Sequence, residues 1–378
     1  MTSQENPHHD EAVRKMLLRV DATVAEEWTG FPHYADLRTG RWTRTDDGFW
    51  TGGFWGGLLA LSSRATDDGG YAQAAGLVAG RVAVRADSDT AFRGFLFWYG
   101  AAVDHLLSKS SVSREAALAG AQGLARSYNA DAGVIPLGAN AEEAGNVGRG
   151  AANIDAVPGT VPLLAWAAGE LDCPDMAKIG INHAERHVEY CVRQDGSVCQ
   201  SAAFDERTGA LLRRYTHKGL HDDSTWARAQ AWAMLAYAQA GQWLSPDFLS
   251  IATHVSDWWL HNAPADHVAR WDFAARGDPS APRDTSATAI AAAALLKLSV
   301  LLPDRPQYRD RAREIVEVLI TDFLTPVGAG DERQPGMLTA GCFDKRHDVA
   351  TNNELVWGDF FLLESLLMLG GVLDPLIL

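Results

Sequence analysis

Several features that would assign the chain to a common class of protein are missing from its sequence. No uninterrupted apolar run reaches the length of a membrane span, and the polar, acidic start lacks the basic region and apolar core of a signal peptide. The cysteines show no Cys-x-x-Cys spacing, so neither a zinc site nor a disulfide framework is indicated for Cys173, Cys191, Cys199 and Cys342. We therefore expect a reduced, cytoplasmic protein without a membrane partner.

Positive charge is also scarce. The chain has 33 lysines and arginines against 48 aspartates and glutamates, a formal net charge of -15. Nucleic acids and anionic membrane surfaces bind through a basic field, so neither is an expected partner. A glycine-rich phosphate loop and a nucleophile elbow are absent too. An anionic small substrate would need a local cationic pocket.

Helical periodicity dominates, whereas alternating β patterns are few. Twelve helices are predicted, over residues 10–27, 51–63, 70–86, 93–107, 114–128, 154–169, 176–192, 226–241, 247–261, 285–301, 307–323 and 355–370. Every second one is the more apolar, as in 94–99 and 287–296, and a helix that is apolar around most of its circumference belongs in an interior. The others, such as 308–316, carry a solvated face and are predicted to lie outside.

This alternation predicts an all-α fold, an (α/α)6 toroid or barrel of six helical hairpins. We expect residues 1–378 to form one domain, with about the first ten residues disordered. An open helical solenoid would show the same alternation, so the sequence leaves closure of the ring undecided. In the toroid all inner helices run the same way. Their N-termini and the preceding loops then gather on one face.

The six loops before the predicted inner helices share a composition rich in aspartate, arginine and tryptophan. They cover residues 46–50, 87–94, 149–155, 221–232, 283–286 and 354–359. Trp50, Trp226 and Trp357 offer flat faces on which a sugar ring can stack. The alternative is that these rings only pack the inner wall of the toroid.

Asp155 directly precedes the apolar segment 156–166. A carboxylate there either caps the predicted helix, where the helix dipole favours it, or acts as a catalytic acid or base. Arginines lie beside the same helix starts, and a guanidinium binds a carboxylate in a bidentate fork. They indicate a site for an acidic sugar, although pairing with nearby aspartates would explain some of them. We expect Arg228 to face the substrate.

Two histidine pairs have the spacing of one helical turn, His183 with His187 and His217 with His221. Such pairs can bind a metal ion. The first has the order His-Ala-Glu-Arg-His, which is not that of zinc proteases. We predict no metal site.

Taken in order, seven segments resemble the unsaturated glucuronyl hydrolases, glycoside hydrolase family 88. They are 47–52, 94–97, 154–155, 223–232, 271–273, 283–287 and 357–359. The resemblance implies an (α/α)6 barrel that needs no metal or organic cofactor. It also implies removal of a 4,5-unsaturated uronic acid from the non-reducing end of oligosaccharides. In that reaction a carboxylic acid protonates C4, water adds at C5, and the hemiketal collapses to release the aglycone.

The resemblance gives Asp155 the role of the central acid and base. The family's second catalytic aspartate is replaced by Phe92, and we expect Asp89, with Asp87 as the alternative just upstream, to supply that carboxylate. Gln200 and Lys218 stand where the family has histidine and glutamine, and the added charge of Lys218 fits an acidic ligand. The expected substrate-binding residues are Arg228, Trp232, Trp226, Lys218, Gln200, Trp42, Trp50, Phe92, Arg93 and Trp357.

Three functional hypotheses follow. The first is a glycoside hydrolase that hydrates an unsaturated uronic acid through Asp155. The second is a divergent hydrolase, hydratase or lyase of the same fold, acting on another acidic or glycosylated metabolite, and Phe92 motivates it. The third is a sugar-binding protein without catalysis. All three expect a small acidic sugar or oligosaccharide as partner and a monomer or homodimer.

Overall fold

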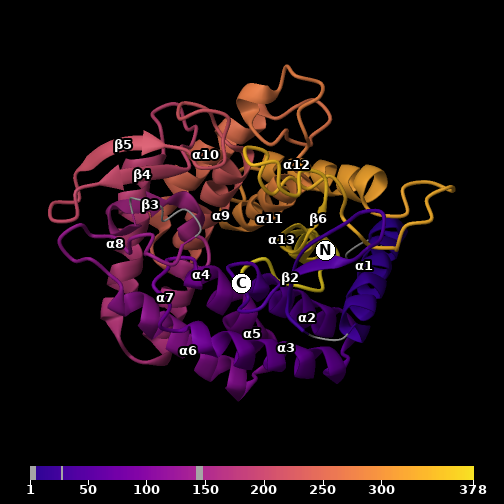
Figure 1. Ribbon diagram of the computed structural model, residues 1–378, viewed down its shortest axis with the longest axis horizontal. Helices are drawn as coiled ribbons and strands as arrows, with labels where there is room; N and C mark the ends of the chain where they lie inside the picture. The colour runs from indigo at the N-terminus through magenta and orange to yellow at the C-terminus, as the bar shows by residue number, and fades with distance from the viewer. Residues whose placement is uncertain (1–5, 27–28, 142–147) are drawn as a thin grey trace.

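The computed structural model describes residues 6–26, 29–141 and 148–378, and within them helices form two concentric layers (Figure 1). The outer layer comprises α1 (Pro7–Ala25), α3 (Gly69–Val82), α6 (Ser111–Arg126), α8 (Pro174–Cys191), α10 (Leu249–Asn262) and α12 (Gln307–Val318). The inner layer comprises α2 (Gly52–Thr66), α4 (Arg93–Phe97) with its continuation through η2 (Trp98–Ala102) into α5 (Val103–Ser108), α7 (Thr160–Glu170), α9 (Ala227–Trp243), α11 (Thr285–Leu301) and α13 (Val356–Leu369). The predicted alternation of inner and outer helices is confirmed.

The inner helices form a closed ring. Going round it, α2 contacts η2, α4 contacts α7, α7 contacts α9, α9 contacts α11, and α11 contacts α13. The last helix, α13, packs back against α2. The fold is therefore the (α/α)6 toroid and not the open solenoid that the sequence also allowed.

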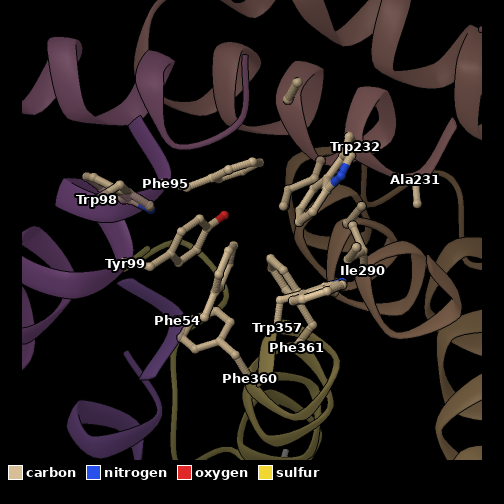
Figure 2. Packing of buried hydrophobic residues seen from close by; sticks show 14 of the residues in the cluster. Phe54, Phe95, Trp98, Tyr99, Ala231, Trp232, Ile290, Trp357, Phe360 and Phe361 are labelled. Atoms are coloured by element: carbon tan, nitrogen blue, oxygen red, sulfur yellow. The ribbon is translucent and has the colours of Figure 1, made fainter. Parts of the chain in front are cut away.

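Burial explains which helices lie inside. In α11 every residue from Thr285 to Leu298 is buried, whereas α12 buries only Tyr308, Ala312, Ile315 and Val316, a stripe at helical spacing. Aromatic rings from several inner helices meet in the middle of the ring (Figure 2). Phe54 stacks on Tyr99 with ring centroids 4.4 Å apart, and Trp232 lies 4.8 Å from Phe95.

Two small antiparallel sheets lie in the loops before the inner helices, and the sequence did not predict them. One has the order β2-β1-β6, from β1 (Phe31–Ala35), β2 (Trp42–Thr45) and β6 (Glu354–Leu355). The other has the order β3-β4-β5, from β3 (Ala151–Asn153), β4 (Ser201–Phe204) and β5 (Leu211–Tyr215). Strands of two to five residues are too short for a period of two to stand out.

The first helix begins earlier than predicted, at Pro7. The side chain of Asn6 accepts a hydrogen bond from the His8 backbone, and proline is favoured at the first helical position. His8 and His9 also bind Glu317 of α12. The expected disorder is therefore wrong for residues 6–10, and residues 1–5 lie outside the described part of the chain.

The helix predicted from residue 154 begins only at Thr160. Pro158 and Gly159 separate it from η4, a single 3-10 turn over Ile154–Ala156. Gly159 has a φ of +81°, and a Cβ atom there would lie 2.9 Å from the Gly94 carbonyl oxygen. Asp155 therefore lies within η4, and the interpretation of Asp155 as the N-cap of α7 is wrong.

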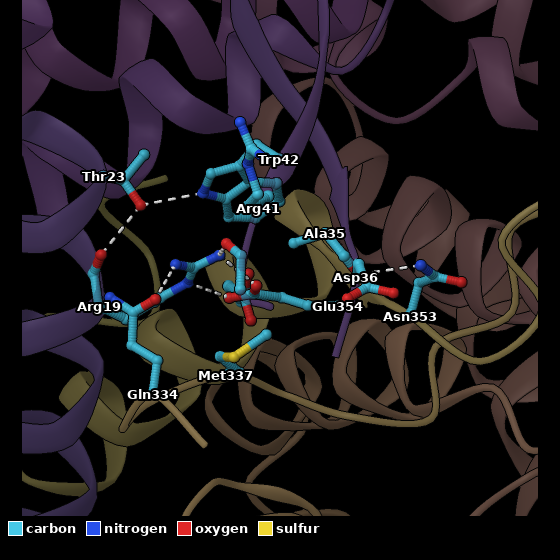
Figure 3. A network of polar contacts seen from close by, with 12 residues as sticks. Arg19, Thr23, Ala35, Asp36, Arg41, Trp42, Gln334, Met337, Asn353 and Glu354 are labelled. Atoms are coloured by element: carbon cyan, nitrogen blue, oxygen red, sulfur yellow. Dashed lines mark hydrogen bonds and ion pairs between the residues drawn. The ribbon is translucent and has the colours of Figure 1, made fainter. Parts of the chain in front are cut away.

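A buried ion pair joins the two ends of the chain (Figure 3). Arg19 of α1 donates to both carboxylate oxygens of Glu354 at 2.8 and 2.6 Å, and to the Gly40 carbonyl at 2.9 Å. Burial, followed by the charge of Glu354, raises the pKa of the neighbouring Asp359 well above its ordinary value. Through its bonds to Glu354, Arg19 holds the strand that leads into α13.

Within the described residues, no helix is long and apolar enough to cross a membrane.

Replacing Arg19→Met should lower the free energy of unfolding by ~3 kcal/mol, because Glu354 would keep a buried charge without its partner. Arg14→Met is the matched control on the same helix, since Arg14 forms an exposed pair with Glu11. Urea unfolding should show a lower midpoint only for Arg19→Met. Equal midpoints for the two variants would contradict the assigned role of the pair.

Candidate active site

A narrow cavity, with about 10 Å³ of space open to a water-sized molecule, lies at the N-terminal ends of the inner helices. Its lining residues are Trp50, Phe92, Phe95, Asp155, Lys218, Trp226, Arg228 and Trp232. Trp50 comes just before α2, Phe92 before α4, and Trp226 before α9. The cavity therefore lies on the face where the sequence placed the chemistry.

Asp155 is held by the strand that precedes it. Its backbone N–H donates to Asn153 Oδ1 at 2.9 Å, and the Ile154 N–H donates to the Gln200 carbonyl at 2.9 Å. The side chain is 7% exposed and reaches the cavity. Among the described residues that line the cavity, Asp155 is the one carboxylate.

Gln200 orients that carboxylate from behind the cavity wall. Its Oε1 accepts hydrogen bonds from the Thr216 hydroxyl at 2.9 Å and from the backbone N–H groups of His217 and Lys218 at 3.0 and 2.9 Å. Three donors on one atom fix which way the amide points. Its Nε2 is therefore directed at Asp155 Oδ2, at 3.5 Å.

Lys218 brings a buried positive charge to the cavity. Its Nζ lies 3.7 Å from Asp344 Oδ2 and 3.8 Å above the ring of Phe343, and the residue is 2% exposed. Burial alone would raise the pKa of Asp344, but the charge of Lys218 and a hydrogen bond from His347 outweigh it and lower that pKa. Asp344 is therefore ionised beside Lys218.

Arg228 is engaged by the protein. Its Nη1 donates to Asp284 Oδ2 at 2.8 Å, and the guanidinium also donates to the carbonyls of Cys342 and Phe343. It lies over Trp226, 4.4 Å from the ring centroid. The pairing of an arginine with a nearby aspartate, which the sequence left open, is therefore present for Arg228. Arg228 Nε is buried without a hydrogen-bond partner among the described residues.

His33 lies close to the charges of the site, although no sequence pattern indicated it. The Nδ1 atom of this buried residue of β1 forms a hydrogen bond with the Thr51 hydroxyl, 3.1 Å away. Burial lowers its pKa to about 3, and the charges of Lys218 and Arg228 act in the same direction. His33 is therefore neutral and adds no charge to the site.

Besides Gln200, which lies behind the wall, four predicted site residues do not line the cavity. Asp89 accepts from the Ala139 N–H at 3.1 Å and lines a separate hollow with Arg149 and Glu206. Arg93 is 1% exposed and donates to the carbonyls of Ala86 and Thr90 and to the Ser127 hydroxyl.

The other two are tryptophans. Trp42 donates to the Thr23 hydroxyl at 3.0 Å, beside Arg19. Trp357 is fully buried and packs against Trp50, 4.9 Å away, so it supports the wall of the cavity from inside the ring. The structure thus brings together Asp155 and six of the expected binding residues, Trp50, Phe92, Lys218, Trp226, Arg228 and Trp232.

Replacing Lys218→Met should raise the pKa of His33, because it removes one of the two positive charges that lower it. The pKa should remain below its ordinary value of 6.5, since burial is the larger cause. Lys218→Arg keeps the charge and is the control. Titration of the His33 ring protons by NMR measures both, and an unchanged pKa in Lys218→Met would refute the assigned electrostatics.

The fold and the cavity together define a class of protein, an (α/α)6 enzyme with one carboxylate and two cations among aromatic rings. No model of a known protein family matches the chain. The unsaturated glucuronyl hydrolase of Bacillus sp. (strain GL1) is 32% identical over 348 residues, 90% of each chain. The unsaturated chondroitin disaccharide hydrolase of Streptococcus pyogenes serotype M1 is 29% identical over 333 residues, 85% of this chain and 81% of the relative.

A comparison with solved structures indicates the same family as these sequence relatives. The crystal structure of the unsaturated glucuronyl hydrolase from Bacillus sp. GL1 superposes with a TM-score of 0.87 and 29% identity, covering 95% of this chain and 96% of that one. The chain belongs to the unsaturated glucuronyl hydrolases, a family of glycoside hydrolases.

Proposed function

We propose that the protein removes a 4,5-unsaturated uronic acid from the non-reducing end of an oligosaccharide, with Asp155 as acid and base. One observation carries this proposal: Asp155 reaches a cavity that also holds Lys218, Arg228 and aromatic rings. A uronic acid offers a carboxylate to the cations and a ring face to the tryptophans. The two relatives are named for hydrolysis of unsaturated glucuronyl and chondroitin substrates.

The reaction needs one carboxyl group in two roles. Asp155 in its acid form gives its proton to C4 of the enol ether, which leaves a cation shared by C5 and the ring oxygen. The Asp155 carboxylate then takes a proton from a water molecule while the oxygen of that water bonds to C5. The hemiketal opens to a ketone at C5, and the hemiacetal at C1 releases the aglycone. The proton that Asp155 gives to C4 is thereby replaced by one taken from water.

Neighbouring groups support these roles. Gln200 Nε2 points at Asp155 Oδ2 and stabilises the carboxylate formed after proton transfer. Trp226 and Trp232 provide faces for the sugar, and Lys218 is placed to attract its carboxylate.

Replacing Asp155→Asn should abolish activity, with a loss of at least about a thousandfold in kcat, because asparagine neither gives nor takes the proton. The assay follows the loss of near-ultraviolet absorbance of the conjugated double bond in unsaturated uronyl disaccharides. Asp89→Asn is the matched control and should retain activity, since Asp89 lies outside the cavity. A wild-type protein that leaves a panel of such disaccharides unchanged would refute the proposed substrate.

A second candidate function, an enzyme of this fold acting on a different acidic or glycosylated metabolite, is favoured by Phe92. This ring is 5% exposed, lies nearly parallel to Phe95, and occupies the wall where the resemblance implies a second carboxylate. A sugar hydroxyl that faces the Phe92 ring would lose its hydrogen bonds to water and would gain no hydrogen bond from the protein in return. The natural substrate would then present an apolar group there.

Replacing Phe92→Asp should raise kcat/KM for unsaturated uronyl disaccharides by about tenfold or more if this second candidate is right, because a carboxylate can accept from the sugar hydroxyls. Phe92→Leu is the control that shortens the side chain without adding an acceptor. Equal activities in the two variants would exclude a missing carboxylate as the cause of altered specificity.

We place the protein in the cytoplasm as part of the same proposal. The support is that Cys173, Cys191, Cys199 and Cys342 all remain free thiols, the last three of them buried.

A further inference from the structure

Two buried histidines stand behind the segment that carries Asp155. His183 and His187 lie one turn apart on α8, both fully buried, with ring centroids 4.3 Å apart. Within the described residues, no group of three or more His, Cys, Asp or Glu side chains is arranged to hold a metal ion. Another role is needed for this pair.

The Nδ1 atom of each ring is occupied by the backbone. His183 Nδ1 accepts from the Ile135 N–H at 3.1 Å, so the proton of this neutral ring is on Nε2. His187 Nδ1 donates to the His183 carbonyl at 2.7 Å. Burial lowers the pKa of His183 well below its ordinary value and that of His187 to about 4, so both rings are neutral.

The Nε2 atom of His183 faces the carbonyl of the residue that follows Asp155. His183 Nε2 donates to the Ala156 carbonyl at 3.4 Å. The backbone of Asn153 lies near the His187 ring, whose Nε2 has no hydrogen-bond partner among the described residues. On the opposite side, the Ile154 N–H donates to the Gln200 carbonyl. The catalytic segment is therefore held from two sides, and α8 provides one of them.

We propose that His183 is a positioning residue for Asp155: its Nε2–H holds the Ala156 carbonyl and so keeps the η4 turn directed at the cavity, with His187 packed behind it. The turn has three residues and is separated from α7 by Pro158 and Gly159, so no longer helix fixes it. A displacement of about 1 Å at a reacting group can cost a hundredfold in rate. This inference rests on the proposed function of Asp155.

Two conservative variants separate the two nitrogens of the ring. In His183→Gln the amide nitrogen can reach the position of Nε2 and bind the Ala156 carbonyl. In His183→Asn the amide oxygen takes the position of Nδ1 and binds only the Ile135 N–H. With unsaturated uronyl disaccharides, we expect kcat about tenfold lower in His183→Asn at unchanged KM, and within about twofold of wild type in His183→Gln.

A role confined to stability would give another pattern. Both variants break one hydrogen bond of a buried ring, so kcat would then be unaffected or would fall equally in both, along with the thermal midpoint. Either result would overturn the proposal.

Amide hydrogen exchange tests the same geometry without using activity. The Ile154, Asp155 and Val157 amides bond to Gln200, Asn153 and Ile154 in turn. Their exchange should accelerate in His183→Asn and stay slow in His183→Gln, whereas the Ile135 amide should show the reverse. If the wild type cleaves no disaccharide, the proposed function fails while exchange still decides this inference. Equal exchange of the turn in both variants would refute it.

Discussion

The last inner helix packs against the first, and this contact between α13 and α2 closes the ring. Both helices are apolar around nearly their whole circumference, so each needs neighbours on all sides. Closure provides them, and it also brings loops that are far apart in the chain to one face. Trp50 precedes the first inner helix and Arg228 lies at the start of the fourth, yet both line the same cavity. The site therefore depends on the packing of the core beneath it.

The charges of the site belong to the fold as well as to the chemistry. Asp284 caps α11 through the Ser286 and Ala287 amides and also pairs with Arg228. Lys218 is paired with Asp344 in the same way. These partners offset the desolvation cost of burying two cations. A buried cation without such a partner would destabilise the fold. The fold thus holds two paired cations beside Asp155 in a protein of strongly negative net charge.

Much of the site could be predicted, and each miss has its own physical cause. Phe92 and Arg93 are neighbours in sequence, yet Phe92 lines the cavity and Arg93 turns toward α6, because adjacent helical residues point about 100° apart. Asp89 lies before that helix and follows the loop to another surface. His33 was missed since a single histidine in a short strand shows no pattern.

The sequence by itself determined the six inner and six outer helices and the face on which chemistry gathers, because periodicity and local composition are properties of neighbouring residues. The catalytic role expected of Asp155 came from the family resemblance, since local composition left a helix cap as an alternative. Only the tertiary structure decided that the ring closes, that Asp155 lies in a separate turn, and that Gln200 and His183 hold it from opposite sides. Such contacts join residues tens of positions apart. Their geometry is set by how helices and short strands pack, which no local pattern records.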